Sequence, residues 1–384
     1  MKQFVEKLRQ AVHYPLLCLF VLFLVFVFCM DMTSTNRQFS EMENRVLNQK
    51  PKFTVEKLVA NEYTMEYEEY VNDQFIWRDG WITLKSVSET ALRKIENNGV
   101  ALGEDGYMFE KYTALNREQL DKNIAFVQEY LAKYPNQQVT LAVIPNSYEV
   151  LAEKVPEGFP NVAQQPLIAE MYSRIEAENL SKLELFPVLD AHDGEYIYYR
   201  TDHHWTTAGA YYAYAAYAES KGLTPVPPEE LAPYAAQTEG FYGTYYSKAK
   251  SYNAQPDIIT RYDLPVESVN IDGKDYDGMY DTSKLAVRDK YASFLWGNHG
   301  LTRIVANSSA ENPTRVLLIK DSYGNSLAPF LTLNYDEVWV VDLRHVFSLS
   351  AVLEMAGGEP FDDVLLMYNY MNFVQDTNLA KLRY

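Results

Sequence analysis

The chain has 384 residues, of which 47% are apolar and 14% aromatic, so it can build one large domain or two ordinary ones, and global disorder is excluded. Its formal net charge of −18 repels nucleic acids and anionic lipids, which excludes both as ligands. The two cysteines, Cys18 and Cys29, lie in one apolar segment, which excludes a disulfide scaffold and a cysteine-based zinc site.

The apolar segment, residues 11–30, carries no charge except a possible proton on His13. Its length suits a helix that crosses the hydrocarbon core of a membrane. Because Lys2, Lys7 and Arg9 precede it, we predict a single-pass anchor with residues 1–10 in the cytoplasm and everything after Asp31 outside the cell. The alternative is a cleaved signal peptide, but no small-x-small cleavage site follows the apolar run.

Residues 31–95 are predicted to form a stalk with helices at 55–75 and 81–95. Residues 96–384 are predicted to form the catalytic domain, because strands and helices alternate there. The alternation breaks at 225–310, a segment rich in Pro, Tyr, Asp and Gly that we interpret as an insertion and a candidate wall of the site.

The catalytic domain is predicted to contain a hairpin at 100–110 that turns at Asp105-Gly106. Helices are expected at 117–134, 162–180 and 206–221, and buried strands at 138–145, 314–320, 336–342 and 362–368. The last three strands are nearly continuous apolar runs, which is typical of strands covered on both faces. The predicted fold is therefore a three-layer α/β/α sandwich with a mostly parallel sheet, preceded by one N-terminal transmembrane helix.

The segment YYRTDHHWTTAGAYYAY, residues 198–214, places Asp202 and His204 two positions apart. In an extended segment these two side chains share a face while His203 points away. The carboxylate can then fix the imidazole tautomer and stabilise its positive charge. Trp205 is a candidate shield against water. The structural alternative is that Asp202 serves only as a turn or N-cap residue.

The segment VLLIKDSYGNSLAPFL, residues 316–331, predicts a buried strand that ends at Lys320 and a tight turn that leads into a helix. Nucleophiles of open α/β sheets lie at this carboxyl edge. Ser322 would lie near backbone N–H groups that can hold an oxyanion, and Gly324 permits close approach of a substrate. Tyr323 and Asn325 complete the turn. The structural alternative is that Ser322 is only a helix cap.

Together the two segments supply the three roles of a Ser322–His204–Asp202 triad. A metal site is the competing interpretation, because His192, Asp193, Asp202, His203 and His204 cluster in the sequence. We expect neither a metal nor another cofactor, because adjacent histidines point apart on a strand and no H-E-x-x-H helix is present.

The chain resembles the DHHW family of bacterial surface proteins and, more broadly, the SGNH-hydrolase-like acetyltransferases typified by alginate O-acetyltransferases. The resemblance rests on SEMENRVLNQKPKF (40–53), VNDQFIWRDGW (71–81), LGEDGYMFE (102–110), RTDHHWTTAGA (200–210) and KDSYGN (320–325). It implies Ser322 as nucleophile, His204 as base and Asp202 as the orienting carboxylate. It also implies a partner, a multi-pass membrane O-acyltransferase that exports the acyl group. The serine block reads KDSYGN rather than the GDS of the wider hydrolase group, which leaves the oxyanion donors open.

Four further residues are candidates for contact with the substrate. Asn146 and Asn369 follow strands and can donate to an oxyanion, or they can be ordinary turn residues. Arg200 and Lys320 flank the triad and can bind an acidic sugar, or they can form salt bridges.

The sequence therefore predicts an extracytoplasmic serine-dependent O-acetyltransferase for a cell-surface polysaccharide. The alternatives are a carbohydrate esterase or deacetylase with the same triad and a non-catalytic glycan-binding scaffold.

Overall fold

The computed structural model describes residues 14–357 and 360–384. The chain divides into two compact units. The first comprises residues up to 93 together with 250–252, and the second comprises 94–249 and 253–384. The predicted cytoplasmic tail 1–10 and the first residues of the predicted span lie outside the described part of the chain.

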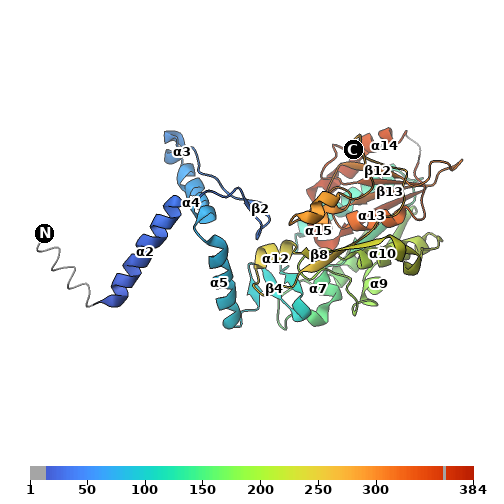
Figure 1. Ribbon diagram of the computed structural model, residues 1–384. Helices are drawn as coiled ribbons and strands as arrows, with labels where there is room; N and C mark the ends of the chain where they lie inside the picture. Colours follow the sequence, from blue (N-terminus) through green and yellow to red (C-terminus); the bar gives the residue numbers. More distant parts are fainter. Residues whose placement is uncertain (1–13, 358–359) are drawn as a thin grey trace, which may run out of the picture. The chain divides into compact units, whose positions relative to one another are not determined.

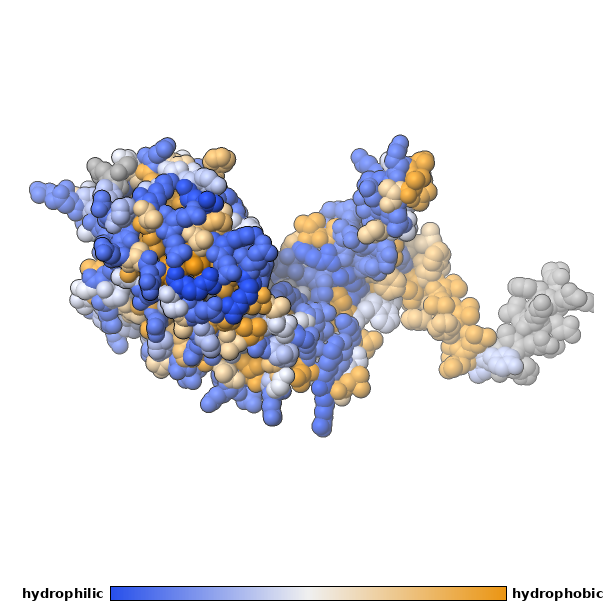
Figure 2. Space-filling model, turned by 180° about the vertical axis from the view of Figure 1, so that it is seen from behind, coloured by the Kyte–Doolittle hydropathy of each residue, from blue (hydrophilic) through white to orange (hydrophobic). Residues whose placement is uncertain are grey.

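The first unit begins with the apolar helix α2 (Pro15–Thr33), which is the orange helix beside the grey terminus in Figure 2. None of its residues is buried, and its length and composition suffice to cross a membrane. A signal sequence has the same properties. The helix extends beyond the predicted segment and includes Asp31, whose carboxylate accepts a hydrogen bond from the backbone N–H of Ile76 at 3.1 Å.

The remainder of this unit is a short hairpin and three helices. The hairpin pairs β1 (Phe39–Ser40) with β2 (Arg45–Val46), and the helices are α3 (Val55–Val59), α4 (Glu62–Gln74) and α5 (Arg78–Ala91). The first predicted stretch, 55–75, breaks at Asn61, which has a positive φ angle of 62°. The second helix begins three residues earlier than predicted, directly after Trp77, whose φ angle is 54°. The buried carboxylate of Asp73 accepts hydrogen bonds from Arg45 and Asn48, which fixes the hairpin to α4.

The second unit opens with a small antiparallel sheet of β3 (Glu96–Asn97), β4 (Val100–Leu102) and β5 (Met108–Glu110). The turn between β4 and β5 is the 3-10 segment η1 (Glu104–Gly106), in which Asp105 and Gly106 have φ of 53° and 78°. The predicted hairpin and its turn are confirmed.

A mixed eight-stranded sheet forms the core of the second unit (Figure 1). Its order is β11 (Lys274–Tyr276), β10 (Ser268–Ile271), β12 (Leu301–Val305), β14 (Glu337–Val341), β13 (Arg315–Lys320), β15 (Asp363–Asn369), β6 (Val139–Ile144) and β7 (Leu180–Glu184). The five strands from β14 to β7 are parallel and the other three are antiparallel. The four predicted strands are confirmed and are almost completely buried.

Helices cover both faces of this sheet. The connection from β13 to β14 runs in the direction opposite to that from β14 to β15, so right-handed crossovers place α13 (Gly324–Leu331) and α14 (Leu349–Met355) on opposite faces. On one face α13 packs beside α10 (Thr207–Ser220). On the other, α6 (Arg117–Lys133) and α14 pack on η6 (Thr377–Arg383), and α6 also contacts α15 (Tyr370–Gln375). This is the predicted three-layer fold.

One helix was predicted too long. Residues 162–180 contain only α8 (Gln165–Arg174), and the edge strand β7 begins at Leu180. The remaining short helices before α10 are α7 (Ser147–Val150), η2 (Ala152–Lys154) and α9 (Phe186–Asp190).

The segment 225–310 is more than a surface insertion, because it supplies the antiparallel strands β10, β11 and β12 of the large sheet. It also contains α11 (Pro228–Leu231), η3 (Ala232–Tyr234), the ribbon of β8 (Ala235–Phe241) with β9 (Asp257–Tyr262), α12 (Thr244–Ala249), η4 (Thr282–Ala286) and η5 (Tyr291–Ser293).

Candidate active site

Ser322 lies where the predicted strand-turn-helix places it, between the carboxyl end of β13 and the start of α13. Inside the turn, the N–H of Gly324 donates to the carbonyl of Asp321 at 3.1 Å, and the N–H of Asn325 donates to that of Ser322 at 3.2 Å. A Cβ atom on Gly324 would collide with the side chain of Lys320. The turn can therefore pack onto the strand only because residue 324 is glycine.

The buried carboxylate of Asp321 anchors this turn to the neighbouring strand. It accepts hydrogen bonds from the N–H of Tyr323 at 2.9 Å, the N–H of Asn369 at 2.8 Å and the side-chain amide of Asn372 at 2.7 Å. Burial raises the pKa of Asp321, and these three donors partly compensate for the lost solvation. Ser322 is thus held by the ends of two parallel strands.

The side chains of Ser322, His204 and Asp202 form one hydrogen-bonded chain. His204 Nε2 lies 2.8 Å from Ser322 Oγ, and His204 Nδ1 lies 2.6 Å from Asp202 Oδ1. An ionised Asp202 accepts a hydrogen bond from the N–H at Nδ1, which fixes the tautomer and leaves Nε2 unprotonated, so that Nε2 can accept the proton of the serine hydroxyl. This is the arrangement of a nucleophile, a general base and an orienting carboxylate.

The carboxylate of Asp202 is saturated by donors. Oδ1 also accepts the backbone N–H of His204 at 3.0 Å, and Oδ2 accepts the N–H of Thr244 at 2.7 Å. Gly243 packs so closely that a Cβ atom there would collide with the carboxylate. Burial alone would raise the pKa of Asp202, but the adjacent His203 and His204 lower it well below its ordinary value. Asp202 is therefore ionised at neutral pH.

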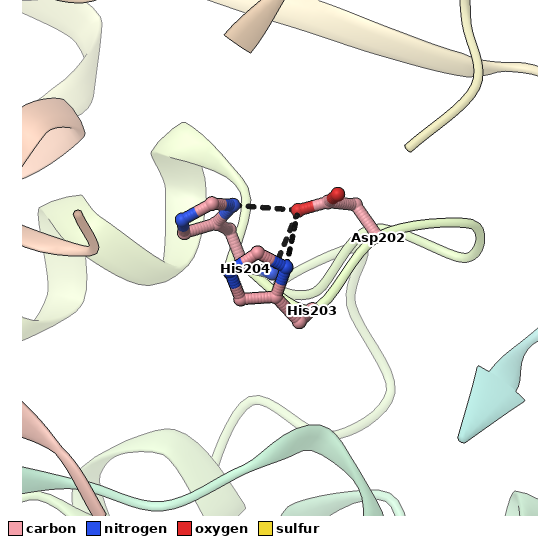
Figure 3. Close-up of side chains that lie close together, drawn as sticks. All are labelled: Asp202, His203 and His204. Atoms are coloured by element: carbon pink, nitrogen blue, oxygen red, sulfur yellow. Dashed lines mark hydrogen bonds and ion pairs between the residues drawn. The ribbon is translucent and has the colours of Figure 1, made fainter. Parts of the chain in front are cut away.

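The expectation that His203 points away from Asp202 is wrong. Residues 200–204 form a bend instead of a strand, so both imidazoles turn toward the same carboxylate oxygen (Figure 3). The Nδ1 atom of His203 lies 3.5 Å from Asp202 Oδ1 and 2.8 Å from Thr244 Oγ1, and the two histidine rings lie 3.8 Å apart. The alternation rule holds for extended backbone only.

Trp205 and Tyr323 join residues 202–205, the DHHW loop, to residues 321–325, the serine turn. The indole N–H of Trp205 donates to the carbonyl of Tyr323 at 3.1 Å and to Ser326 Oγ at 2.9 Å. In return, the hydroxyl of Tyr323 donates to the carbonyl of His203. Because both rings are fully buried, these bonds fix the distance between the base and the nucleophile.

The electrostatic environment of His204 favours its neutral form. Burial is the main cause, and the neighbouring His203 acts in the same direction, so the pKa of His204 falls to about 4 although Asp202 opposes the shift. An imidazole that is neutral at pH 7 is able to accept the proton of Ser322.

Asp202, His203 and His204 also place three potential ligand atoms within 4.8 Å of one another. Ligand atoms about 2.0 Å from a tetrahedral zinc ion would lie roughly 3.3 Å apart. The 2.6 Å between His204 Nδ1 and Asp202 Oδ1 fits a direct hydrogen bond instead, and His204 Nε2 is engaged by Ser322. The donor set therefore fits a triad better than a metal centre.

The predicted oxyanion donors need correction. The N–H groups of Tyr323, Gly324 and Asn325 are all engaged inside the turn. The amide of Asn369 caps α15 through Met371 and donates to the carbonyl of Ile144, so it is a turn residue. Among the described residues, no acceptor engages the N–H of Ser322 itself.

The side chain of Asn146 is buried and accepts a hydrogen bond from Gln164 at 2.8 Å. The amide of Asn325 donates to Asn298 at 3.0 Å, while its buried Oδ1 atom has no partner among the described residues.

The two predicted sugar-binding cations differ. Lys320 is buried and its ammonium lies 3.2 Å from Asp342 Oδ2, so the prediction that it binds a sugar is wrong. Arg200 is half-buried, and its guanidinium lies 4.6 Å from the ring centroid of Tyr196 and 5.4 Å from that of Tyr107. It lines a polar cavity of about 550 Å³. Its Nε–H donates to the backbone carbonyl of Asp105 at 3.2 Å.

Sequence reasoning missed several residues from other segments that contact residues 200–204 or act on them electrostatically. Asp257 on β9 accepts the backbone N–H groups of Arg200 and Thr201, each at 2.8 Å. Tyr291 on η5 lies against His204. Arg344 follows β14, and its guanidinium donates two hydrogen bonds to the carboxylate of Asp342, at 2.8 and 2.5 Å. Its positive charge lowers the pKa of His204. Only Arg344 had a sequence signal, its place just after a buried strand.

The profile of the DHHW protein family matches residues 100–341. Among solved structures, the chain is similar to a DHHW family protein from Eubacterium siraeum, with a TM-score of 0.64 and 24% identity over 74% of this chain and 95% of that one. It is also similar to PatB1 of Bacillus cereus, solved with a sulfonyl adduct, with a TM-score of 0.58 and 17% identity over 74% and 98% of the two chains.

A sequence relative is the probable alginate O-acetylase AlgJ of Pseudomonas fluorescens, which is 30% identical over 120 residues. The match covers 29% of this chain and 30% of the relative, so it spans less than a third of either protein.

Proposed function

Because this chain belongs to the DHHW protein family, with a fold shared with PatB1, we propose that it is an extracytoplasmic O-acetyltransferase acting on a cell-surface polysaccharide. The observation that carries the proposal is the hydrogen-bonded chain from Ser322 through His204 to Asp202. The sequence relative named as an alginate O-acetylase supports acetyl transfer to a polysaccharide.

In the proposed reaction, Ser322 Oγ attacks the carbonyl carbon of an acetyl donor while its proton moves to His204 Nε2. The carbonyl electron pair moves to the oxygen, and the N–H of Ser322, for which the described residues offer no acceptor, is the proposed donor to that oxyanion. Collapse of the intermediate breaks the bond to the leaving group, which takes the proton from Nε2. A sugar hydroxyl then repeats these steps on the acetyl-serine and leaves with the acetyl group.

The acceptor and partners belong to the same proposal. The exposed part of Arg200, between two tyrosine rings, suits a sugar that carries a carboxylate. Acetyl groups would reach Ser322 from a multi-pass membrane O-acyltransferase, and α2 would anchor this chain beside it.

The first test is covalent labelling of the full chain in detergent micelles with p-nitrophenyl acetate. Ser322 should gain about 42 Da, the mass of one acetyl group that replaces a hydrogen. Ser322→Ala should lose the adduct while its circular dichroism stays unchanged, because only one oxygen is removed. Ser220→Ala, at the exposed end of α10, serves as the control and should keep the adduct. An adduct on another residue, or none on a folded chain, contradicts the triad and favours a glycan-binding scaffold.

The second test separates transfer from hydrolysis. Oligosaccharides with free hydroxyl groups should accelerate turnover of the acetyl-serine and become acetylated, as detected by mass spectrometry. Release of acetate alone, at a rate that the sugars do not change, would instead identify an esterase with the same triad.

A further inference from the structure

Tyr291 lies flat against the proposed catalytic base. Its ring centroid is 3.8 Å from that of His204, and the two planes differ by only 8°. The side chain is 6% exposed, so the contact is dry. Tyr291 belongs to η5 in the segment 225–310 and is separated from His204 by 86 intervening residues.

The hydroxyl of Tyr291 reaches the nucleophile as well. It donates to the backbone carbonyl of Ser322 at 3.0 Å and lies 3.3 Å from Ser326 Oγ. One side chain therefore touches the ring of the base and the backbone of the nucleophile. Because burial raises the pKa of Tyr291 well above its ordinary value, the hydroxyl keeps its proton and remains a donor.

Other rings and charged groups also surround the imidazole of His204. His203 lies 3.8 Å from it with a plane tilted by 37°, so it occupies a different side of the imidazole from Tyr291. Tyr323 lies 4.9 Å away on the serine turn. The charged groups that act on His204 are Asp202 and His203 on its own loop and Arg344 after β14. Tyr291 thus covers one face of the imidazole.

We infer that Tyr291 is a positioning residue: its ring fixes the plane of the His204 imidazole and excludes water from it, while its hydroxyl fixes the backbone of Ser322. The inference rests on the proposed function, because it assigns a role within the same triad. When His204 accepts the serine proton, the electron-rich face of the tyrosine also stabilises the imidazolium that forms. Tyr291 therefore acts on His204 through its ring and on Ser322 through its hydroxyl.

The test uses the full chain in detergent micelles and measures kcat and KM for p-nitrophenyl acetate from pH 3.5 to 8. In the unmodified protein, activity should fall on the acid side near the pKa of His204, about 4. Tyr291→Phe keeps the stacked ring and removes the hydroxyl. It should lower kcat about tenfold, because one hydrogen bond is lost. The acid limb of the pH profile, where activity falls as His204 becomes protonated, should stay at the same pH because the stacked ring remains.

Tyr291→Leu removes both contacts. It should lower kcat on the order of a hundredfold or more. It should also move the acid limb upward by about one pH unit or more, because the solvation that His204 regains, the main cause of its low pKa, outweighs the lost contact with the tyrosine face. KM should change by less than about threefold in both variants, since neither removes a contact with the ester.

Tyr280→Phe is the matched control. Tyr280 lies in the same segment, is 8% exposed and donates to the carbonyl of Tyr262 at 3.0 Å. It touches none of the three triad residues, so both kcat and the acid limb should be retained. Circular dichroism checks that each variant is folded. If the Leu variant does not fold, the Phe variant decides: unchanged kcat, or a shifted acid limb, overturns the role of Tyr291.

The outcomes separate the two proposals. Activity that requires Ser322 but is unaffected by both Tyr291 substitutions overturns the role of Tyr291 and leaves the triad standing. Activity that survives Ser322→Ala overturns the triad itself, and the role of Tyr291 with it.

Discussion

Two adjacent histidines share one carboxylate oxygen in the DHHW loop, yet only one of them reaches the nucleophile. His204 Nε2 contacts Ser322 Oγ, whereas His203 Nδ1 contacts Thr244 Oγ1 and its side chain is 29% exposed. At the scale of the residue, His204 is therefore the proposed base, and His203 supports Asp202 and the loop.

This difference predicts unequal losses of activity. His204→Ala should lower kcat for p-nitrophenyl acetate on the order of a thousandfold or more, because no other group can take the serine proton. His203→Ala leaves the bond between His204 and Asp202 and should cost about tenfold or less. Equal losses in both variants, together with one equivalent of zinc by elemental analysis, would instead support the metal interpretation.

At the scale of the element, the ends of β13 and β14 are joined by a buried ion pair next to the serine turn. Lys320 ends β13 and its ammonium meets the fully buried Asp342, which follows β14. Burial lowers the pKa of Lys320, because the charged form loses its solvation. Burial alone would raise the pKa of Asp342, but Arg344 and Lys320 lower it to about 2.

We expect Asp342→Asn to destabilise the protein by roughly 3 kcal/mol, because it leaves the ammonium of Lys320 buried without a counter-charge. Adding Lys320→Met should restore most of that loss, since an apolar side chain then fills the same space. Chemical denaturation followed by circular dichroism measures both variants. A double variant no more stable than Asp342→Asn would show that the unpaired ammonium of Lys320 does not destabilise the protein.

The same pair predicts how stability depends on pH. The folded pKa of Asp342, about 2, lies below the ordinary value of 3.8, so the carboxylate contributes about 2 kcal/mol above pH 3.8. This contribution should be lost as the pH falls from 3.8 toward 2. Asp342→Asn should show a correspondingly flatter acid limb of the unfolding free energy.

At the scale of the whole molecule, α2 is the helix on which the predicted location of the protein rests. Lys2, Lys7 and Arg9 precede the apolar segment, so residues after 31 should face outward. Protease added to intact cells should digest the region after 31 and spare a cytoplasmic marker protein. Protection of that region would reverse the predicted orientation, and a released protein that begins near Asp31 would identify a cleaved signal sequence.

Much of the fold could be predicted because local patterns of apolar residues in the sequence indicate its buried strands. The buried strands of the large sheet are continuous apolar runs such as VLLI before Lys320, which is typical of a sheet covered on both faces. β7 was missed because its exposed residues do not form such a run, and the residues before it continue a helical pattern. The strands β10, β11 and β12 were missed because they are short, with 4, 3 and 5 residues, and therefore form no long apolar run.

The sequence by itself determined the local setting of the proposed nucleophile and base, because Ser322 lies in the turn after a buried strand and Asp202 and His204 lie two residues apart. Only the tertiary structure decided how they meet. The bend at 200–204 turned His203 toward Asp202, and distant residues such as Thr244, Asp257 and Tyr291 fixed the loop. Local periodicity records which side chains are buried, whereas contacts between segments some 40 to 90 residues apart depend on chain packing that no local pattern encodes.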